Sequence, residues 1–337
     1  MNRLLEEDIQ SVVDRCAGFR SHFENKVFLI TGATGLIGST IVNSLLKMND
    51  EFGAGIRIIV TTRNIEKAKE EFGDSVVIKL SNDSIEERID YIIHCAAPTQ
   101  SKFFVEKPVE TMDAVILDTR RMLKIAQEKQ VEKFLYVSSM EAYGTVLANK
   151  KMDESELGFI PLDSVRSSYS EGKRAAELYT HAFAKEFGVP TVSARLAMCF
   201  GAGIRKDDNR VHKSFCESAL VGQDIVMKSS GETVINYVYS TDAAVALLML
   251  LVKGNIGEVY NVSGDNYDKT IADMAKMVAG FGGVDVKKEI QDTSMFAPVN
   301  KMTLDNSKMK GLGWSPENGL EDSLRRLFQY LGGEVED

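Results

Sequence analysis

The sequence predicts an α/β fold in which a doubly wound parallel sheet is followed by a smaller α/β C-terminal lobe. Two observations favour this fold class. Short apolar segments alternate with longer helical stretches from residue 26 to about residue 200, a rhythm typical of a parallel sheet covered by helices on both faces. A glycine-rich turn also follows the first apolar segment and opens a helical stretch, as in dinucleotide-binding folds.

The expected elements follow one another in a simple order. An amphipathic helix is predicted within residues 1–24, where Leu4, Ile9 and Val12 recur at helical spacing. We therefore expect an N-terminal helical extension (1–24), a dinucleotide-binding domain (25–200) and a mainly substrate-binding lobe (201–337) that is interleaved with the sheet. The strands expected in the sheet are 26–31, 56–62, 76–80, 90–97, 133–139 and 191–198, and the lobe adds a strand at 224–230 and a helix at 272–281.

Composition and charge exclude several classes of protein. A chain of 337 residues with 44% hydrophobic content can bury a large core, and its net charge of -9 argues against nonspecific binding to nucleic acid or to an anionic membrane. The four cysteines form no CxxC pair, and neither they nor the scattered histidines indicate a metal site. The longest apolar run, 243–252, is too short to span a bilayer, and the start lacks a signal-peptide core. We expect a soluble cytoplasmic protein.

The glycine-rich turn "ITGATGLIGST" occupies residues 30–40. Gly32, Gly35 and Gly38 have the spacing that permits a tight turn, close approach of the backbone to a pyrophosphate and close packing of helix against strand. The N–H groups at the start of the next helix would face that anion. Because strand, turn and helix occur together, we interpret the segment as a Rossmann-type dinucleotide site and not as a plain connection.

The end of the second strand bears on which dinucleotide binds. An acidic residue there would hold the ribose 2′-OH of NAD, whereas this strand ends "VTTRN" without a carboxylate. Arg63 suits a 2′-phosphate, and Thr61 or Thr62 would add hydroxyl contacts, with Asn64 completing the segment. We predict that NADP(H) is preferred and that NAD(H) is possible. The alternative is a solvated arginine at the start of a surface helix.

Tyr169 and Lys173 stand four residues apart at the start of a helical stretch, so both lie on one face. A phenol with a pKa of about 10 is a poor acid or base at neutral pH, and a neighbouring ammonium is expected to lower that pKa. The pair alone is a common pattern. Together with the glycine turn and with Ser139 at the end of an intervening strand, it indicates a catalytic group.

The chain resembles the extended short-chain dehydrogenases/reductases of the nucleotide-sugar epimerase/dehydratase group. The segments that carry the resemblance are the glycine turn, "HCAAPTQ" (94–100), "VSSMEAYG" (137–144), "YSEGK" (169–173), "FGAG" (200–203), "YSTDAA" (239–244) and "LGWSPENGLEDSLRR" (312–326). The resemblance implies that Ser139, Tyr169 and Lys173 are catalytic, that Lys173 also holds the nicotinamide ribose, and that the protein forms a homodimer. It further implies that the cofactor site comprises Gly32, Thr34, Gly35, Leu36, Ile37, Gly38, Thr62, Arg63, Asn64, Ala96, Ala97, Tyr169 and Lys173.

Several positions depart from the pattern of that group. Dehydratases of the group present Thr-Asp-Glu where this chain has Ser139, Met140 and Glu141, and a methionine cannot donate a proton. Glu141 remains a candidate base, or else a carboxylate satisfied by backbone or substrate groups. Met198 replaces an asparagine expected near the substrate and Ile235 replaces an arginine for its diphosphate. We therefore expect the cations Arg205, Lys206, Arg210 and Lys213 to hold the diphosphate, with Ser139, Met140, Met198, Arg205 and Arg210 as substrate contacts.

The sequence leaves three hypotheses about function. The leading one is an NADP(H)-dependent reductase of a nucleotide-activated sugar or keto-alditol, in which Tyr169 protonates the carbonyl oxygen and Ser139 stabilises the developing charge. The first alternative is a nucleotide-sugar epimerase, dehydratase or decarboxylase that recycles NAD(P) and uses Glu141 as a base. The second is a noncatalytic NADP-binding regulator, which would have no need of the tyrosine.

Overall fold

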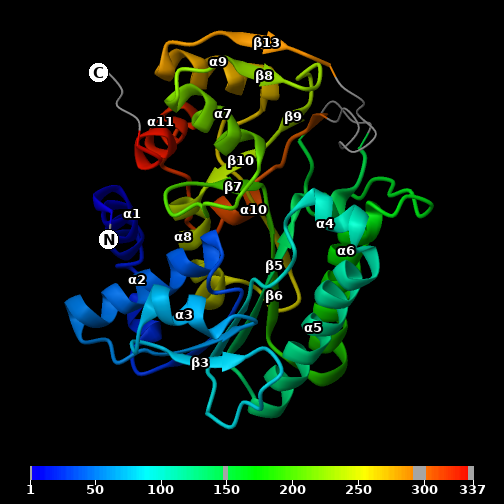
Figure 1. Ribbon diagram of the computed structural model, residues 1–337. Coiled ribbons are helices and arrows are strands. Elements are labelled where there is room, and N and C mark those ends of the chain that lie inside the picture. The colour runs from blue at the N-terminus through cyan, green and yellow to red at the C-terminus, as the bar shows by residue number, and fades with distance from the viewer. Residues whose placement is uncertain (1, 147–150, 291–300, 333–337) are drawn as a thin grey trace.

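A seven-stranded parallel sheet forms the centre of the molecule, in the order β11-β6-β5-β4-β1-β2-β3 (Figure 1). The computed structural model describes residues 2–146, 151–290 and 301–332. The strand order reverses between β1 and β4, the feature that defines a doubly wound sheet, and the predicted fold class is confirmed. The strands are β1 (Val27–Thr31), β2 (Arg57–Thr62), β3 (Val77–Leu80), β4 (Tyr91–His94), β5 (Lys133–Ser139), β6 (Thr191–Leu196) and β11 (Val259–Val262).

Two expected strands are shorter than the apolar pattern predicts. The strand expected over 90–97 ends at His94, because Ala96 N–H turns away to donate to Thr31 Oγ1 at 3.1 Å. The strand expected over 191–198 divides, because Met198 N–H donates to Asn236 O at 3.0 Å and leaves the central sheet. Met198 opens β7 (Met198–Phe200), which pairs with β10 (Tyr237–Tyr239) of the lobe.

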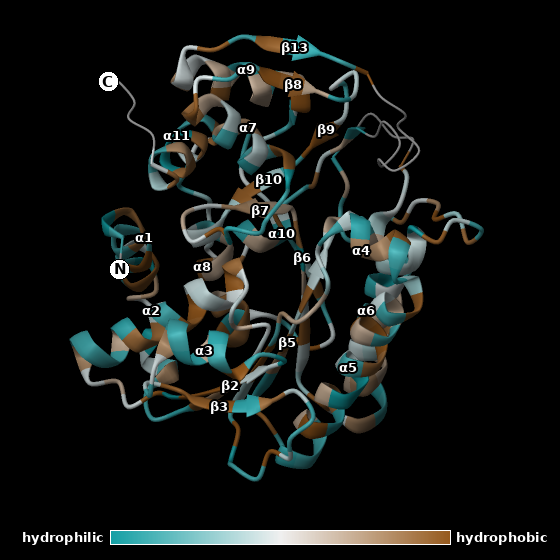
Figure 2. Cartoon of the chain, in the orientation of Figure 1, coloured by the Kyte–Doolittle hydropathy of each residue, from teal (hydrophilic) through white to brown (hydrophobic). Residues whose placement is uncertain are grey.

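Helices cover both faces of the sheet. On one side lie α4 (Ser101–Glu106), α5 (Pro108–Lys129) and α6 (Ser167–Phe187), while α2 (Leu36–Phe52), α3 (Ile65–Phe72) and α8 (Ser240–Lys253) lie on the other (Figure 1). Several of these helices end in glycines with a left-handed backbone, as at Gly53 (φ 60°) and Gly188 (φ 68°). The strands of the sheet are coloured largely brown for hydrophobic residues, and teal hydrophilic residues recur along the surrounding helices (Figure 2).

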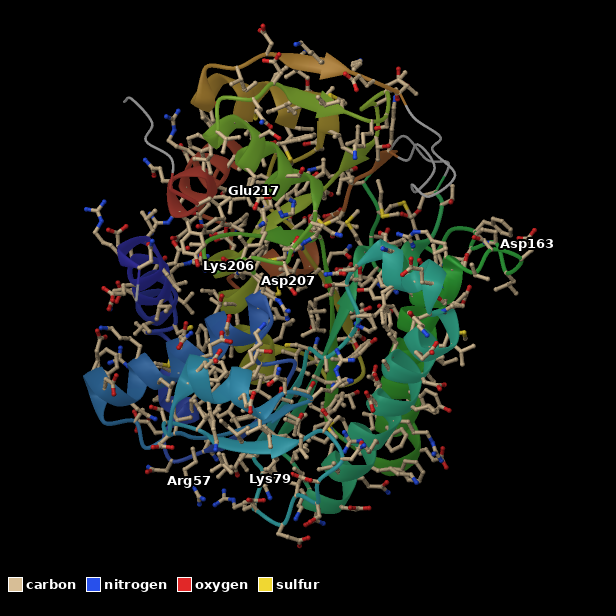
Figure 3. All side chains as sticks on the ribbon, in the orientation of Figure 1. Arg57, Lys79, Asp163, Lys206, Asp207 and Glu217 are labelled. Carbon is tan, nitrogen blue, oxygen red and sulfur yellow. The ribbon has the colours of Figure 1, made fainter. Side chains whose placement is uncertain are left out.

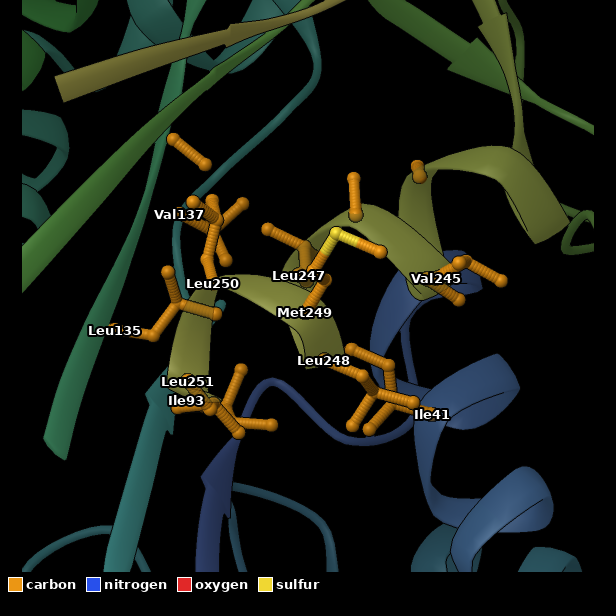
Figure 4. Packing of buried hydrophobic residues seen from close by; sticks show 14 of the residues in the cluster. Ile41, Ile93, Leu135, Val137, Val245, Leu247, Leu248, Met249, Leu250 and Leu251 are labelled. Carbon is orange, nitrogen blue, oxygen red and sulfur yellow. The ribbon is translucent and has the colours of Figure 1, made fainter. Parts of the chain in front are cut away.

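The apolar run at 243–252 lies within helix α8, which is buried along nearly its whole length. Leu247, Leu248 and Leu250 are fully buried against the sheet and α2, next to Ile41 and Ile93 (Figure 4). Burying each such leucine contributes about 1.5–3 kcal/mol, so this segment is a core helix. Across the described residues, we find no helix with both the length and the apolar character that crossing a bilayer requires.

The smaller lobe has its own apolar core between helices and short strands (Figure 1). Helix α9 begins with a capping box in which Thr270 and Asp273 satisfy each other's backbone N–H groups. The remaining elements are α7 (Val211–Leu220), β8 (Ile225–Met227), β9 (Val234–Ile235), β12 (Lys269–Thr270), α9 (Ile271–Gly282), β13 (Val286–Lys288), β14 (Lys301–Met302), α10 (Ser307–Lys310) and α11 (Leu320–Tyr330).

The first helix, α1 (Arg3–Arg15), is followed by a short 3-10 helix, η1 (Arg20–Phe23), and packs against α2 and α8. Buried Asp8 accepts a hydrogen bond from Tyr239 Oη at 2.8 Å and pairs with Arg326 of α11. Arg15 Nη1 lies 2.7 Å from the fully buried carboxylate of Asp242. These ion pairs join α1 to both the sheet domain and the lobe, while the division of the chain into domains at residues 25 and 201 stays a prediction.

Candidate active site

The glycine turn connects β1 to α2 with almost no free space around it. Gly32 has φ 67°, and a Cβ there would meet Ala96 N at 2.8 Å; a Cβ at Gly38 would meet Gly32 O at 2.4 Å. Gly35 caps α2 without a side-chain hydrogen bond, and no acidic residue lies in the first turn. The N–H groups at the start of α2 therefore have no side-chain carboxylate competing for them, which suits a pyrophosphate. The other predicted cofactor residues along this edge are Thr34, Leu36, Ile37 and Ala97.

The end of β2 carries a free cation. Arg63 is exposed, and its guanidinium has no hydrogen bond or ion pair within the described part of the chain. The charge of Arg63 acts on Asp118 of α5. Burial raises the pKa of Asp118, and the positive charges of Arg121 and Arg63 partly offset that rise. Asn64 caps α3 by accepting from Lys67 N–H at 3.0 Å, and Thr62 hydrogen-bonds with Asn64. No carboxylate follows this strand before residue 66.

Tyr169 lies in the first turn of α6, with its ring stacked face to face on Phe104 of α4 at 4.3 Å and 5°. The tyrosine is buried, and this desolvation raises the pKa of its phenol, with the negative charge of Glu141 adding to the rise. The Ser139 hydroxyl, which hydrogen-bonds to the phenol, and the charges of Arg166 and Arg210 act in the opposite direction. The expectation that a neighbouring ammonium lowers this pKa is wrong for this structure, because burial outweighs the nearby cations. The phenol is protonated at neutral pH.

Lys173 follows one turn along α6 and is almost completely buried. Its Nζ donates to Val137 O of β5 at 2.8 Å and lies 4.8 Å from the ring centre of Tyr136 and 5.7 Å from that of Tyr169. Burial lowers the pKa of this ammonium to about 8. Lys173 therefore holds a buried charge without a carboxylate partner among the described residues.

Ser139 ends β5, and its Oγ accepts a hydrogen bond from Glu141 N–H at 3.2 Å, at the start of the 3-10 helix η2 (Met140–Tyr143). Glu141 points toward α6. Its two carboxylate oxygens accept from Arg166 Nη1 at 2.8 Å and Nη2 at 3.0 Å, and Oε2 also accepts from Ser170 Oγ at 3.0 Å. A carboxylate held by three donors is less available as a base than a free one. Met140 is buried in the core beside it.

The cations predicted for the substrate diphosphate all have other partners here except Lys206, for which the described residues offer none. The Asp208 carboxylate accepts hydrogen bonds from Arg210 Nε and Nη2, with nitrogen-to-oxygen distances of 2.7–3.0 Å. Arg210 Nη1 also donates to Cys199 O at 2.7 Å and lies 3.9 Å from Met198 Sδ. Arg205 pairs with Asp207 at 2.6 Å, and Lys213 pairs with Glu217. Lys206 and Asp207 lie on the side of the lobe that faces α2 and α3 (Figure 3).

Sequence reasoning missed two residues beside Tyr169, namely Phe104 and Arg166. Arg166 is the N-cap residue of α6, three positions before the tyrosine, and that spacing was the available signal, since residues three apart on a helix are neighbours. Phe104 gave no signal because it comes from a separate helix. His94 bridges Thr31 (2.7 Å) and Thr119 (3.1 Å), and burial lowers its pKa to about 3. Among the described residues no group of three or more His, Cys, Asp and Glu side chains could hold a metal ion.

Comparison with known proteins places this geometry among nucleotide-sugar enzymes. A family model described as "NAD dependent epimerase/dehydratase family" matches residues 28–263. The chain is 28% identical over 331 residues to UDP-glucuronic acid decarboxylase 1 of Xenopus tropicalis, covering 94% of this chain and 75% of that protein. It is 26% identical over 332 residues to dTDP-D-glucose 4,6-dehydratase of Homo sapiens, covering 93% and 91%. Among solved structures, UDP-glucose 4-epimerase with UDP-glucose from Thermotoga maritima has a TM-score of 0.78 at 26% identity, covering 90% of this chain and 98% of that chain.

Proposed function

The chain belongs to the NAD dependent epimerase/dehydratase family and thus to the extended short-chain dehydrogenases/reductases, and from this premise we propose that it is an NADPH-dependent reductase of a nucleotide-activated sugar or keto-alditol. The enzyme class agrees with the resemblance read from the sequence. The direction of the reaction, the preference for NADP(H) and the role of each site residue belong to the proposal, as does a homodimer.

The observation that carries the proposal is the position of Tyr169, which is buried, stacked on Phe104 and one helical turn from Lys173. The Tyr169 phenol carries a proton at neutral pH, as an ordinary tyrosine does, and burial raises its pKa further. Tyr169 therefore holds the proton that a carbonyl reduction consumes. Bound NADPH would supply the hydride for the carbonyl carbon. Tyr169 would donate its proton to the oxygen, and Ser139 would donate a hydrogen bond to the same oxygen as charge develops there.

Met140 and Glu141, the described residues at the dehydratase acid and base positions, favour simple reduction over elimination. Met140 has no proton to give to a leaving hydroxyl, and Glu141 is paired with Arg166 at 2.8 Å and 3.0 Å. Dehydration needs one group to protonate the leaving oxygen and another to remove a carbon-bound proton. Reduction of a carbonyl, in which hydride adds to the carbon and Tyr169 protonates the oxygen, needs neither of these two additional groups.

Arg63 supports NADP(H) as the preferred cofactor. It is an exposed cation at the end of β2, with no carboxylate in the place where an acidic residue would hold the ribose 2′-OH of NAD. Replacing Arg63 with Gln is expected to weaken NADPH binding by roughly 10- to 100-fold, the effect of one charge-assisted hydrogen bond, and to leave NADH binding nearly unchanged. Arg57→Gln, at the other end of β2 (Figure 3), is the matched control. Equal losses for both cofactors would contradict the assignment.

The names of the relatives support a nucleotide-activated sugar as the substrate class, since they include UDP-glucuronic acid decarboxylase and dTDP-D-glucose 4,6-dehydratase. We infer a nucleoside diphosphate held by the lobe, with Arg210 as the candidate among the four predicted cations, because its charge acts on Tyr169. Binding would require Arg210 to exchange Asp208 for the diphosphate. Arg205 is a weaker candidate, because its charge acts on Glu71 of α3.

The test is anaerobic absorbance at 340 nm with NADPH and a panel of CDP-, UDP-, GDP- and dTDP-linked sugars and ketoses, with products followed by mass spectrometry. The proposal expects stoichiometric loss of NADPH and a product heavier by two hydrogens. A product of unchanged mass, or one lighter by water or CO2, without net loss of NADPH would overturn the reductase.

That second result would support an epimerase, dehydratase or decarboxylase with a recycled cofactor, which the names of the relatives favour. Of these, the pairing of Glu141 with Arg166 favours an epimerase or decarboxylase, because the redox exchange that such a reaction needs at one carbon can use Tyr169 alone. Adding NAD and following exchange of a solvent or cofactor deuterium into the sugar would identify it.

A further inference from the structure

Arg166 has one hydrogen-bonding partner for its guanidinium in the described part of the chain. Both terminal nitrogens donate to Glu141, at 2.8 Å and 3.0 Å, while Nε is buried without an acceptor. The guanidinium carbon also lies 5.4 Å from the ring centre of Phe104. The orientation of Arg166 therefore depends on the carboxylate in η2 and on the aromatic ring in α4.

The same two partners are the neighbours of Tyr169. Phe104 stacks on the tyrosine ring at 4.3 Å, and Phe104 O accepts from Ser168 Oγ at 3.3 Å, which ties α4 to the first turn of α6. Glu141 also accepts from Ser170, the residue after the tyrosine. Arg166, Ser168 and Ser170 thus hold the backbone on both sides of Tyr169 to two neighbouring segments.

Opposite charges act on the phenol from this arrangement. The negative charge of Glu141 disfavours the phenolate and the positive charge of Arg166 favours it, so the two partly cancel while they are paired. The titratable and charged groups that face the phenol from the surrounding elements are Glu141 of η2, Arg166 at the N-cap of α6, Lys173 of α6, Tyr136 of β5 and Arg210 before α7, and the Ser139 hydroxyl at the end of β5 lies beside them.

We propose that Arg166 is a positioning residue for the reaction at Tyr169, which it serves by holding Glu141 as a paired counter-charge and by fixing the Phe104–Tyr169 stack. This inference rests on the proposed function in one respect, the exchange of a proton by Tyr169. It assigns Glu141 a role as the fixed partner of a cation, in place of the role of a base.

Removal of the Arg166 charge alone and removal of the Glu141 charge alone should therefore shift the pKa of the Tyr169 phenol in opposite directions. Arg166→Met leaves the carboxylate unpaired beside the phenol, whereas Glu141→Gln leaves the guanidinium unpaired. In the pH dependence of kcat/KM for alcohol oxidation with NADP+, the apparent pKa of the proton acceptor should rise by about one unit in Arg166→Met and fall by about one unit in Glu141→Gln. The double variant should return close to the wild-type value, and Arg166→Lys should restore part of the shift.

Arg174→Met is the matched control. Arg174 lies on the same helix and holds the same η2 segment, donating to Ala142 O at 3.0 Å and Tyr143 O at 3.1 Å. Its loss should weaken folding without moving the apparent pKa. If Arg166→Met and Glu141→Gln shift the pKa in the same direction, or leave it unmoved as Arg174→Met does, the inference is overturned.

A second measurement needs no substrate. Absorbance at 295 nm in alkali, taken as the difference between each variant and its Tyr169→Phe counterpart, reports ionisation of Tyr169 alone. The ionised fraction should decrease in the order Glu141→Gln, wild type, Arg166→Met, and any other order overturns the inference. If wild type turns over no member of the substrate panel while this order holds, the proposed function fails and the positioning role of Arg166 stands.

Discussion

One stripe of helix α6 carries two regions of opposite character. Tyr169, Lys173, Glu177 and Thr180, here called the α6 stripe, share the face toward β5 and β6. In the second half, Glu177 accepts from Arg195 Nε at 3.0 Å and Nη2 at 2.8 Å and from Ser138 Oγ. In the first half, Lys173 has only a backbone carbonyl as a hydrogen-bond acceptor among the described residues. Burial is the same in both halves, whereas charge compensation differs.

The two halves differ in whether a buried charge has a partner of opposite charge among the described residues. A buried ion pair whose donors and acceptors are all satisfied costs little beyond its desolvation. A buried ammonium without a counter-ion stays unfavourable until a ligand supplies polar partners, and burial lowers the pKa of Lys173 to about 8. In the second half, Glu177 and Arg195 thus compensate each other's charge, whereas Lys173 in the first half has no carboxylate partner among the described residues.

The largest expected effect is in the first half of the α6 stripe. Tyr169→Phe removes the proton donor and keeps the ring stacked on Phe104, so kcat/KM should fall by roughly 10²- to 10⁴-fold with NADPH affinity and thermal stability nearly unchanged. Steady-state kinetics, fluorescence titration and calorimetry measure the three quantities. Tyr179→Phe on the same helix is the control. Full activity in Tyr169→Phe would sink the catalytic assignment and favour a noncatalytic binder.

The second half should respond in stability. Glu177→Gln leaves Arg195 buried without a counter-charge, and we expect the free energy of unfolding to fall by about 3–5 kcal/mol. Urea unfolding measures it. Glu171→Gln, which breaks a half-buried pair with Arg174 at 3.4 Å, should cost about 1 kcal/mol or less. The double variant Glu177→Gln/Arg195→Met should be less unstable than the sum of its single changes, and additive losses would show that the two groups do not act as a pair.

Lys173→Met should make the protein without cofactor more stable while abolishing activity. The folded-state pKa of about 8 lies below the ordinary 10.5, so between these values the unfolded state binds more protons and stability rises with pH. Below pH 8 the variant should exceed wild type by up to about 3 kcal/mol, and the gap should close as pH approaches 10.5. Unfolding of both proteins at neutral and alkaline pH measures the gap. A gap that is independent of pH would contradict the uncompensated charge.

The smallest effect is expected at the far end of the α6 stripe. Thr180 Oγ1 lies 2.9 Å from Ser193 Oγ and donates to Glu177 O at 2.7 Å. Thr180→Val keeps the shape and loses only these neutral hydrogen bonds, so the free energy of unfolding should fall by about 1 kcal/mol. Catalysis and its pH dependence should stay at wild-type values. A shift in the pH profile would mean that the two halves of the stripe are coupled.

The sheet and the α6 stripe differ in how far the sequence predicts them. Alternating apolar segments and the glycine turn depend on local periodicity, and the six strands expected before residue 200 all lie in the sheet. The spacing of Tyr169 and Lys173 likewise predicts a shared helical face, which the structure confirms. Other features depend on which segments meet in space, and periodicity carries no information about that. They are the pairing of Arg166 with Glu141, the pairing of Arg210 with Asp208, and the entry of β11 into the sheet.

The ion pair between Asp8 of the first helix and Arg326 of the last one bears on how the chain matures. Asp8 is synthesised long before Arg326, because most of the sequence separates the two residues. At about 5–20 residues per second, tens of seconds separate them. Until Arg326 has been synthesised, α1 lacks the cation that pairs with Asp8, whose carboxyl has a raised pKa in the folded protein because burial outweighs the charge of Arg326. The ion pair that holds α1 against α11 can therefore form only after α11 has been synthesised, well after the glycine turn.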